Sequence, residues 1–194
     1  MMPFVSPAAA SEASLETVAL LRRLGKGEAE ALDQIYRRES ASVYRYALAL
    51  SGNPAWAADA MQDAFVSLAA RPAGFDPLRG TLGAYLAGIA RHALMQRWRE
   101  PGAPDTENEA AGDEAQPSPE DLLVRAQDQA QVWAAIRRLP WPQREALVLV
   151  DLQQRPYAEA AAIAAVEINT LRTRLHRARL RLAQDLNAGR GEQR

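Results

Sequence analysis

The chain has 194 residues and no cysteine, which excludes disulfide scaffolds, thiol nucleophiles and zinc or iron–sulfur centres held by cysteine. Hydrophobic residues make up 48% and charged residues 24%, which excludes a wholly disordered protein. The formal net charge of -1 hides an uneven distribution: residues 1–100 carry 11 basic and 10 acidic side chains, residues 101–121 carry 0 and 7, and residues 122–194 carry 12 and 7. An acidic middle followed by a basic end indicates an anionic partner for part of the chain.

The start of the chain and its apolar runs predict a soluble protein. The segment MMPFVSPAAASEASLE has no basic region, and proline and serine interrupt its apolar residues, so we expect no targeting peptide. The longest purely apolar runs, such as residues 160–166, are far shorter than the roughly 20 residues of a membrane span. We therefore expect a cytoplasmic protein with no direct membrane insertion.

The first half of the chain predicts four helices after a flexible N-terminus of residues 1–14. Apolar residues recur at steps of three and four, and no segment shows the period of two that is typical of a strand. The helices are expected near 15–24, 32–50 and 56–68 and from residue 82 onward, separated by glycine and proline at 25–27, 51–54 and 71–80. The predicted buried stripe of the fourth helix consists of Leu82, Leu86, Ile89 and Ala93.

The other faces of this fourth helix carry polar and aromatic side chains at helical spacing. Arg91 and Trp98 lie on one face with Met95, and His92, Gln96 and Arg99 form the adjacent stripe. Arginine, amide and tryptophan side chains on a solvent-facing side can bind phosphates and stack on unpaired bases. The alternative is a solvated basic helix end with Trp98 folded onto the core.

Residues 101–121 predict a flexible acidic linker. The surrounding segment, EPGAPDTENEAAGDEAQPSPED, contains four prolines and no large apolar residue. Without apolar surface to bury, nothing offsets the entropy of ordering it, and its like charges favour extension. Two domains are therefore expected, at residues 15–100 and 122–186, with a tail at 187–194.

The second half predicts further helices that end in a helix-turn-helix. One helix ends at residues 139–142, LPWP, and another spans about 143–152. A short alanine-rich helix from Tyr157, a turn near 165–167 and a long helix capped by Asn169 or Thr170 follow. The predicted core side of the long helix is formed by Leu171, Leu175, Ala178 and Leu182. The fold expected for the chain is all-α, with two small helical domains.

Five arginines and no acidic residue occur between residues 168 and 183. Such a helix is destabilised by repulsion between like charges unless an anion screens it. Arginines near the start of the second helix of this motif suit the major groove, where arginine reads guanine edges and binds phosphates. The alternative is a solvated basic helix that binds nothing, or one that binds an acidic protein.

Four segments together make the sequence resemble the extracytoplasmic-function (ECF) class of bacterial RNA polymerase sigma factors, within the sigma-70 family. Residues 59–65, DAMQDAF, resemble the helix that binds core RNA polymerase, and residues 75–91, FDPLRGTLGAYLAGIAR, resemble the loop and helix that recognise and melt the -10 element. Residues 139–147 and 157–159, together with 170–179, TLRTRLHRAR, resemble the helix-turn-helix that binds the -35 element. The segments follow the family's order and cover most of the chain.

The resemblance implies three sets of contact residues. Those expected on the β′ clamp helices of core polymerase are Asp59, Gln62, Asp63 and Phe65, although in an ordinary amphipathic helix Phe65 would lie in the core. Those expected at the opened -10 strand are Phe75, Asp76, Arg79, Arg91, His92, Gln96, Arg97 and Trp98. Those expected at the -35 duplex are Tyr157, Thr170, Arg172, Thr173, Arg174, His176 and Arg177.

The sequence departs from the family at five positions. His92 stands where asparagine is usual, Gln96 where aspartate is usual, and Tyr85 where tryptophan is frequent. Ala165 replaces the usual turn glycine, and Asn169 replaces the glycine before the recognition-helix threonine. Because the hydrophobic stripes are kept, these differences concern the promoter sequence rather than the class.

The resemblance also implies partners: core RNA polymerase, including its β flap, promoter DNA and an anti-sigma factor. The acidic linker would thread the basic interior of the polymerase, or would be a generic tether. No cofactor or metal is expected, and an enzyme is disfavoured because the two histidines, His92 and His176, lie in different domains and no catalytic motif is present. Two other functions remain: a sigma-like mimic that sequesters an anti-sigma factor, and a helix-turn-helix repressor.

Overall fold

The computed structural model describes residues 7–99 and 119–191, with side chains described at 14–99 and 129–187. Every regular element in these ranges is helical, which confirms the predicted all-α class. The chain divides into two compact units, Met1–Ala47 with Ala55–Pro101, and Leu48–Pro54 with Gly102–Arg194. The predicted acidic linker lies outside the described residues except for residues 119–121. No helix within the described ranges is long and apolar enough to cross a membrane.

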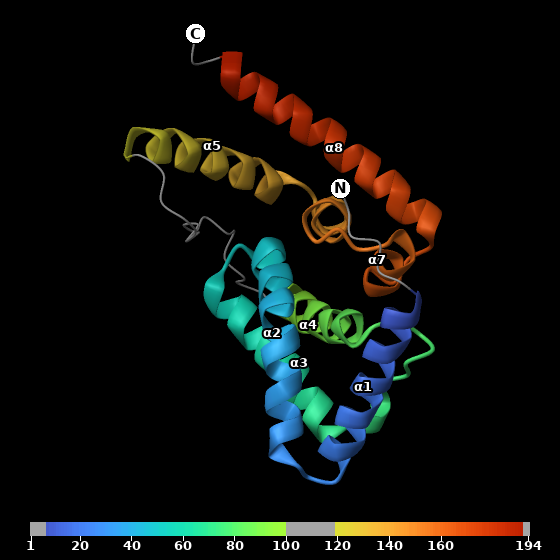
Figure 1. Ribbon diagram of the computed structural model, residues 1–194. Helices are drawn as coiled ribbons and strands as arrows, with labels where there is room; N and C mark the ends of the chain where they lie inside the picture. The colour runs from blue at the N-terminus through green and yellow to red at the C-terminus, as the bar shows by residue number, and fades with distance from the viewer. Residues whose placement is uncertain (1–6, 100–118, 192–194) are drawn as a thin grey trace. The chain divides into compact units, whose positions relative to one another are not determined.

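The first half of the chain forms the four predicted helices (Figure 1). They are α1 (Pro7–Gly25), α2 (Ala29–Ser51), α3 (Pro54–Ala70) and α4 (Leu82–Arg99), with a short 3-10 turn, η1 (Pro72–Gly74), before α4. The first helix begins at Pro7, within the segment expected to be flexible, because alanines and a glutamate that favour helix follow a proline suited to a first helical position.

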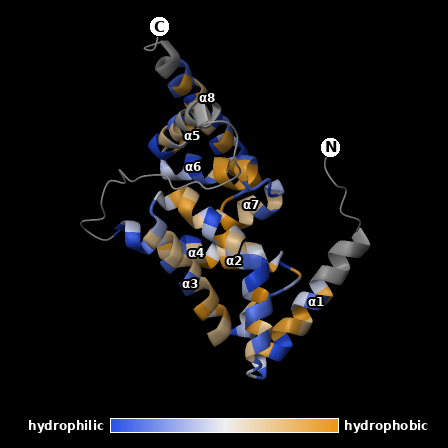
Figure 2. Ribbon diagram, turned by 60° about the vertical axis from the view of Figure 1, so that its left-hand side comes forward, coloured by the Kyte–Doolittle hydropathy of each residue, from blue (hydrophilic) through white to orange (hydrophobic). Residues whose placement is uncertain are grey.

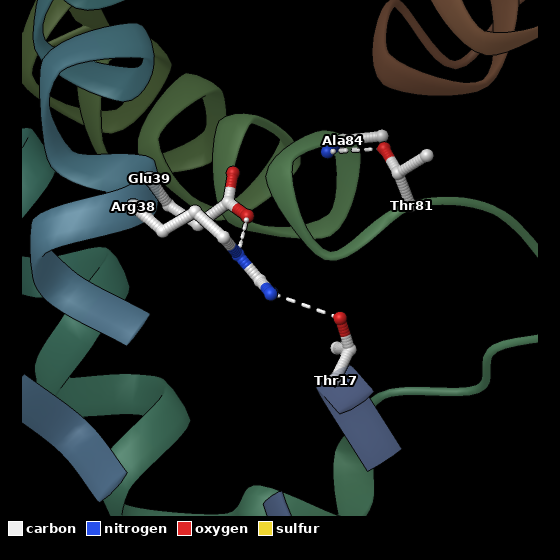
Figure 3. A network of polar contacts seen from close by, with 5 residues as sticks. All are labelled: Thr17, Arg38, Glu39, Thr81 and Ala84. Atoms are coloured by element: carbon white, nitrogen blue, oxygen red, sulfur yellow. Dashed lines mark hydrogen bonds and ion pairs between the residues drawn. The ribbon is translucent and has the colours of Figure 1, made fainter. Parts of the chain in front are cut away.

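A polar contact between the first two helices fixes α1. The Arg38 guanidinium on α2 donates one hydrogen bond to the Thr17 hydroxyl, at 2.8 Å, and another to the Glu39 carboxylate, at 2.9 Å (Figure 3). Thr17 is buried, so this bond satisfies a hydroxyl that would otherwise be costly to remove from water. The helix α1 also packs against η1, which precedes α4 in the chain.

The buried face of α4 differs in part from the predicted stripe. Leu82 and Leu86 are buried as expected, whereas Ile89 and Ala93 are only half-buried. The remaining buried positions are Gly83, Ala87, Ala90 and Leu94. A helix that is packed on more than one side buries a wider arc than a single 4-3-4 stripe, and the small residues among these, glycine and alanine, let neighbouring elements approach closely.

The second half of the chain has four helices, α5 (Pro119–Arg138), α6 (Trp141–Leu147), α7 (Tyr157–Ile163) and α8 (Ile168–Gly191). A one-turn π-helix, η2 (Val148–Leu152), continues α6 where the sequence predicted one α-helix. Figure 2 shows α7 mainly in hydrophobic colours and α8 with extensive hydrophilic stretches. The long helix α8 packs against α5, α6 and α7 and buries Leu171, Leu175 and Ala178, as predicted, with Leu182 half-buried.

Three boundaries in this half extend further than predicted. The α5 helix takes in residues 119–121 of the expected linker, because Pro119 followed by Glu120 and Asp121 suits a helix start. The α8 helix begins at Ile168, so Asn169 and Thr170 lie in its first turn rather than at its cap. It also continues to Gly191, through most of the predicted tail.

A buried arginine ties the end of α5 to α6. The Arg144 guanidinium donates hydrogen bonds to the carbonyl oxygens of Arg137 and, at 3.2 Å, of Leu139. These carbonyls end a helix and have no partner within it, so the guanidinium caps them. Burial, with a smaller contribution from the charge of Arg137, lowers the Arg144 pKa to about 10.

Candidate nucleic-acid interface

The exposed side of α3 presents the polar residues predicted to contact polymerase. Asp59, Gln62 and Asp63 are all exposed on this helix. Phe65 is only 5% exposed, and its ring lies against that of Tyr36 on α2, with 4.8 Å between the ring centroids. Phe65 therefore belongs to the core, and the aromatic surface it supports belongs to Tyr36, which is 42% exposed.

The loop before α4 is held by its own side chains. An Asp76 carboxylate oxygen accepts a hydrogen bond from the Leu78 backbone N–H at 2.9 Å, and the Asp76 carbonyl accepts one from Arg79 at 3.0 Å. The Phe75 ring contacts the edge of Tyr85, with 5.8 Å between centroids. The Tyr85 hydroxyl lies 2.9 Å from where a side chain on Gly74 would begin, so this approach requires glycine.

These contacts show that some of the predicted loop residues hold the loop in shape and that others face solvent. Asp76 and half-buried Phe75 shape the loop, whereas Arg79 is exposed. Leu78, which the sequence analysis did not single out, is 94% exposed. Nothing in the sequence distinguished it from the other residues of the loop.

The outward side of α4 carries the predicted stacking and polar residues. His92 and Gln96 are exposed, and Trp98 is 40% exposed, so Trp98 is not folded into the core. The Gln96 side-chain amide lies 3.0 Å from Nε2 of His92. The structure thus brings together two of the three α4 residues at which the sequence departs from the family pattern, the third being Tyr85. Arg91 is half-buried on the same helix.

Arg97, which is also predicted to contact the -10 element, pairs with a residue predicted to contact polymerase. Its Nη1 donates to Oδ2 of Asp59 on α3 at 2.6 Å. Its guanidinium carbon lies 5.6 Å from the centroid of the Trp56 ring, within the range of a cation–π contact. The sequence assigned Asp59 and Arg97 to different partners and gave no sign of this contact, since 38 residues separate them.

The helix-turn-helix places its predicted residues along the first turns of α8. Thr170, Arg172, Thr173, His176 and Arg177 are exposed, and Arg174 is half-buried. Arg172 lies over the exposed ring of Tyr157 on α7, 5.5 Å from its centroid. This contact joins two predicted -35 residues from separate helices.

A further arginine of α8 is neutralised by a carboxylate from another element, which nothing in the sequence near that arginine indicated. Arg179 donates to both carboxylate oxygens of Asp151 on η2, at 2.9 and 2.6 Å. The hydrogen bonds that Arg179 donates to the Asp151 carboxylate raise the Arg179 pKa above its usual value. Within the described residues, Arg174 and Arg177 have no such ion-pair partner. The helix α8 therefore carries both arginines that are neutralised by a carboxylate and arginines that are not.

Comparison with known proteins identifies two sigma regions in this order. Residues 35–102 match Sigma-70 region 2, and residues 129–182 match Sigma-70 region 4. The ECF RNA polymerase sigma factor SigM of Mycobacterium tuberculosis is 34% identical over 158 residues, covering 81% of this chain and 78% of SigM.

Two further proteins that are similar to this chain are also sigma factors. SigE of Mycolicibacterium smegmatis, also an ECF sigma factor, is 30% identical over 156 residues; the match covers 77% of this chain and spans 59% of SigE's length. The sigma factor RpoE in complex with the anti-sigma factor NepR from Bartonella quintana is a similar solved structure, with a TM-score of 0.65 and 27% identity over 80% of this chain and 96% of RpoE. With both sigma regions in order and these identities, the chain belongs to the ECF RNA polymerase sigma factors of the sigma-70 family.

Proposed function

We propose that the protein binds core RNA polymerase and directs it to promoters through -10 and -35 elements, initiating transcription of a signal-responsive regulon. The observation that carries this proposal is that each matched sigma region contains a helix, α4 or α8, with exposed basic and polar side chains. A protein that only mimicked a sigma factor towards another protein would not need DNA-suited surfaces in both regions.

In region 2, the exposed carboxylates and amide of α3 dock on the basic β′ clamp helices of core polymerase, and the exposed Tyr36 ring that lies against Phe65 adds an aromatic contact. The loop that Asp76 and Phe75 shape receives a base flipped from the -10 non-template strand, and Arg79 binds phosphate. His92, Gln96 and Trp98 contact the opened strand by hydrogen bonding and stacking. Unstacking each base costs a few kcal/mol, which these contacts offset.

In region 4, the first turns of α8 enter the major groove of the -35 element. Arg174 and Arg177 supply charges that no carboxylate neutralises within the described residues, and Arg172 is steadied by Tyr157. Thr170 and Thr173 lie in the same turns. Some of these arginines bind phosphates and fix the register, whereas others read base edges. Region 4 also contacts the polymerase β flap, and the acidic residues of 101–121 follow the basic interior of the enzyme.

An anti-sigma factor controls this activity. The support is the similar RpoE, whose structure is of a complex with the anti-sigma factor NepR. The partner would cover the same helical surfaces that contact polymerase or DNA.

Run-off transcription tests the proposal. Purified core polymerase and the full chain are supplied with a library of upstream regions from the source genome, and specific transcripts that require the protein are expected. Arg174→Ala should reduce them, whereas Arg181→Ala, which removes an equal charge further along α8, serves as the matched control. Binding to an anti-sigma factor with no binding to polymerase or DNA would instead establish a mimic.

A further inference from the structure

The contact between α3 and α4 joins two residues that the resemblance to sigma factors assigns to different partners. Asp59 is predicted to dock on polymerase and Arg97 to contact DNA, yet they form an ion pair of 2.6 Å. The side chains are 54% and 40% exposed, so competing ions from solvent or from a partner can reach both. The Trp56 ring beneath the guanidinium holds Arg97 on the α3 side of the pair.

The two expected partners present opposite charges to this pair. A basic group of polymerase would take the Asp59 carboxylate, and a DNA phosphate would take the Arg97 guanidinium. Each partner replaces one half of the existing ion pair, so its binding leaves the other half without its counter-ion. A charge released in this way is available to the second partner without a further pair having to be broken.

We infer that the Asp59–Arg97 ion pair is an autoinhibitory contact that withholds Arg97 from DNA until polymerase engages Asp59. The inference rests on the proposed function. Because the contact is an equilibrium coupling, it acts in both directions: DNA bound to Arg97 also strengthens the attachment of polymerase to Asp59. Its size is that of one exposed ion pair, up to about fivefold in affinity.

The expected effects of single substitutions on the free protein have opposite signs for the two partners. Asp59→Asn should strengthen binding to a short mixed-sequence single-stranded DNA by up to about fivefold and weaken binding to core polymerase. It should also steepen the salt dependence of DNA binding by about 0.7, the value for one more phosphate contact on a single strand. Arg97→Gln should weaken binding to this DNA and strengthen binding to core polymerase.

The experiment measures both affinities by fluorescence anisotropy for the full-length protein, D59N, R97Q and the double variant. Asp33→Asn is the matched control, because Asp33 forms a comparable exposed pair with Arg37, at 2.9 Å, and has no assigned partner. Asp33→Asn changes the net charge and releases an arginine as D59N does, so it reports the effect of losing an exposed, paired carboxylate elsewhere on the surface.

The decisive result is the effect of D59N in the R97Q background. The inference expects the gain in DNA affinity to disappear there, because Arg97 is no longer present to be released. A gain that persists in R97Q, or that equals the gain from Asp33→Asn, would show a general charge effect and overturn the inference. If the unsubstituted protein bound neither core polymerase nor the oligonucleotide, the proposed function itself would fail, which is a different result from loss of coupling.

Discussion

The helices α4 and α8 begin in different ways, although both are proposed to contact DNA. At the start of α4 the residue types fit the backbone conformation. Gly80 has a φ of +145°, and the Thr81 hydroxyl accepts a hydrogen bond from the Ala84 N–H at 3.2 Å (Figure 3). Before α8, Ala165 holds a left-handed φ of +53°, where a side chain is unfavourable. Backbone bonds from Ala165 to Ala162 and from Val166 to Ala161 maintain this turn.

The comparison shows that a turn can be maintained either by the residue that suits it or by its surroundings. In the α4 loop, local chemistry and backbone geometry agree. At the α7–α8 turn, the hydrogen bonds and the burial of Ala161, Ile163 and Ala164 impose a conformation that Ala165 disfavours. The two turns should therefore respond in opposite directions when glycine and alanine are exchanged.

The largest change in stability is expected for Gly80→Ala. A side chain at a φ of +145° is strained, so the substitution should lower the free energy of unfolding of the first unit by about 1–3 kcal/mol. Chemical denaturation measures this difference. Gly88→Ala is the matched control within α4, where nothing lies within 4 Å of the added carbon and alanine should be neutral or stabilising. Equal stability of the two variants would contradict the prediction.

The next largest effect is expected on DNA binding, when an unpaired arginine of α8 is removed. Arg174→Ala should weaken binding to a -35 duplex by about 1–3 kcal/mol if it contacts a base. If it contacts phosphate, it should reduce the slope of log K against log salt by about 0.9. A salt titration of duplex binding distinguishes these results, and an unchanged affinity and slope would remove Arg174 from the interface.

A smaller change in stability is expected for Ala165→Gly, and its sign is opposite to that of Gly80→Ala. Relief of the left-handed strain should exceed the extra chain entropy of glycine and stabilise the second unit by about 1 kcal/mol. Ala162→Gly, at an exposed position inside α7, provides the control and should destabilise by about 1 kcal/mol. Thermal unfolding measures both, and a lower midpoint for Ala165→Gly would show that its Cβ makes a favourable contact.

The sequence predicted the local features of the fold, namely helices and turns, better than the contacts between elements. Helical periodicity and the glycines and prolines between helices predicted all four helices of the first half, because these signals are local. The sequence also predicted the turn at 165–167. It left open whether Phe65 is buried or meets polymerase, and it did not reveal the π-helix that follows α6 or the burial of Ala90 in place of Ile89 in the α4 core. These depend on which neighbouring element packs against each residue, and periodicity within one helix does not contain that information.

The ion pairs are the clearest example of this limit. Residues 168–183 of α8 contain five arginines and no acid, and the sequence predicted a repulsive surface there. The structure supplies Asp151 from another element and neutralises Arg179. The basic surface of α8 is therefore narrower than its sequence suggests and is concentrated on its earlier turns.

The smallest effect on DNA binding should come from Arg179→Ala. Because Asp151 already neutralises this guanidinium, its removal should leave the salt slope of -35 duplex binding unchanged and lower stability by no more than about 1 kcal/mol. Asp151→Asn should do the reverse, releasing Arg179 and steepening the slope by up to about 0.9. If Arg179→Ala reduced the slope as much as Arg174→Ala, phosphate would be taking Arg179 from Asp151 in the complex. The α8 pair would then be an exchangeable contact like the one inferred for Asp59 and Arg97, rather than a fixed part of the fold.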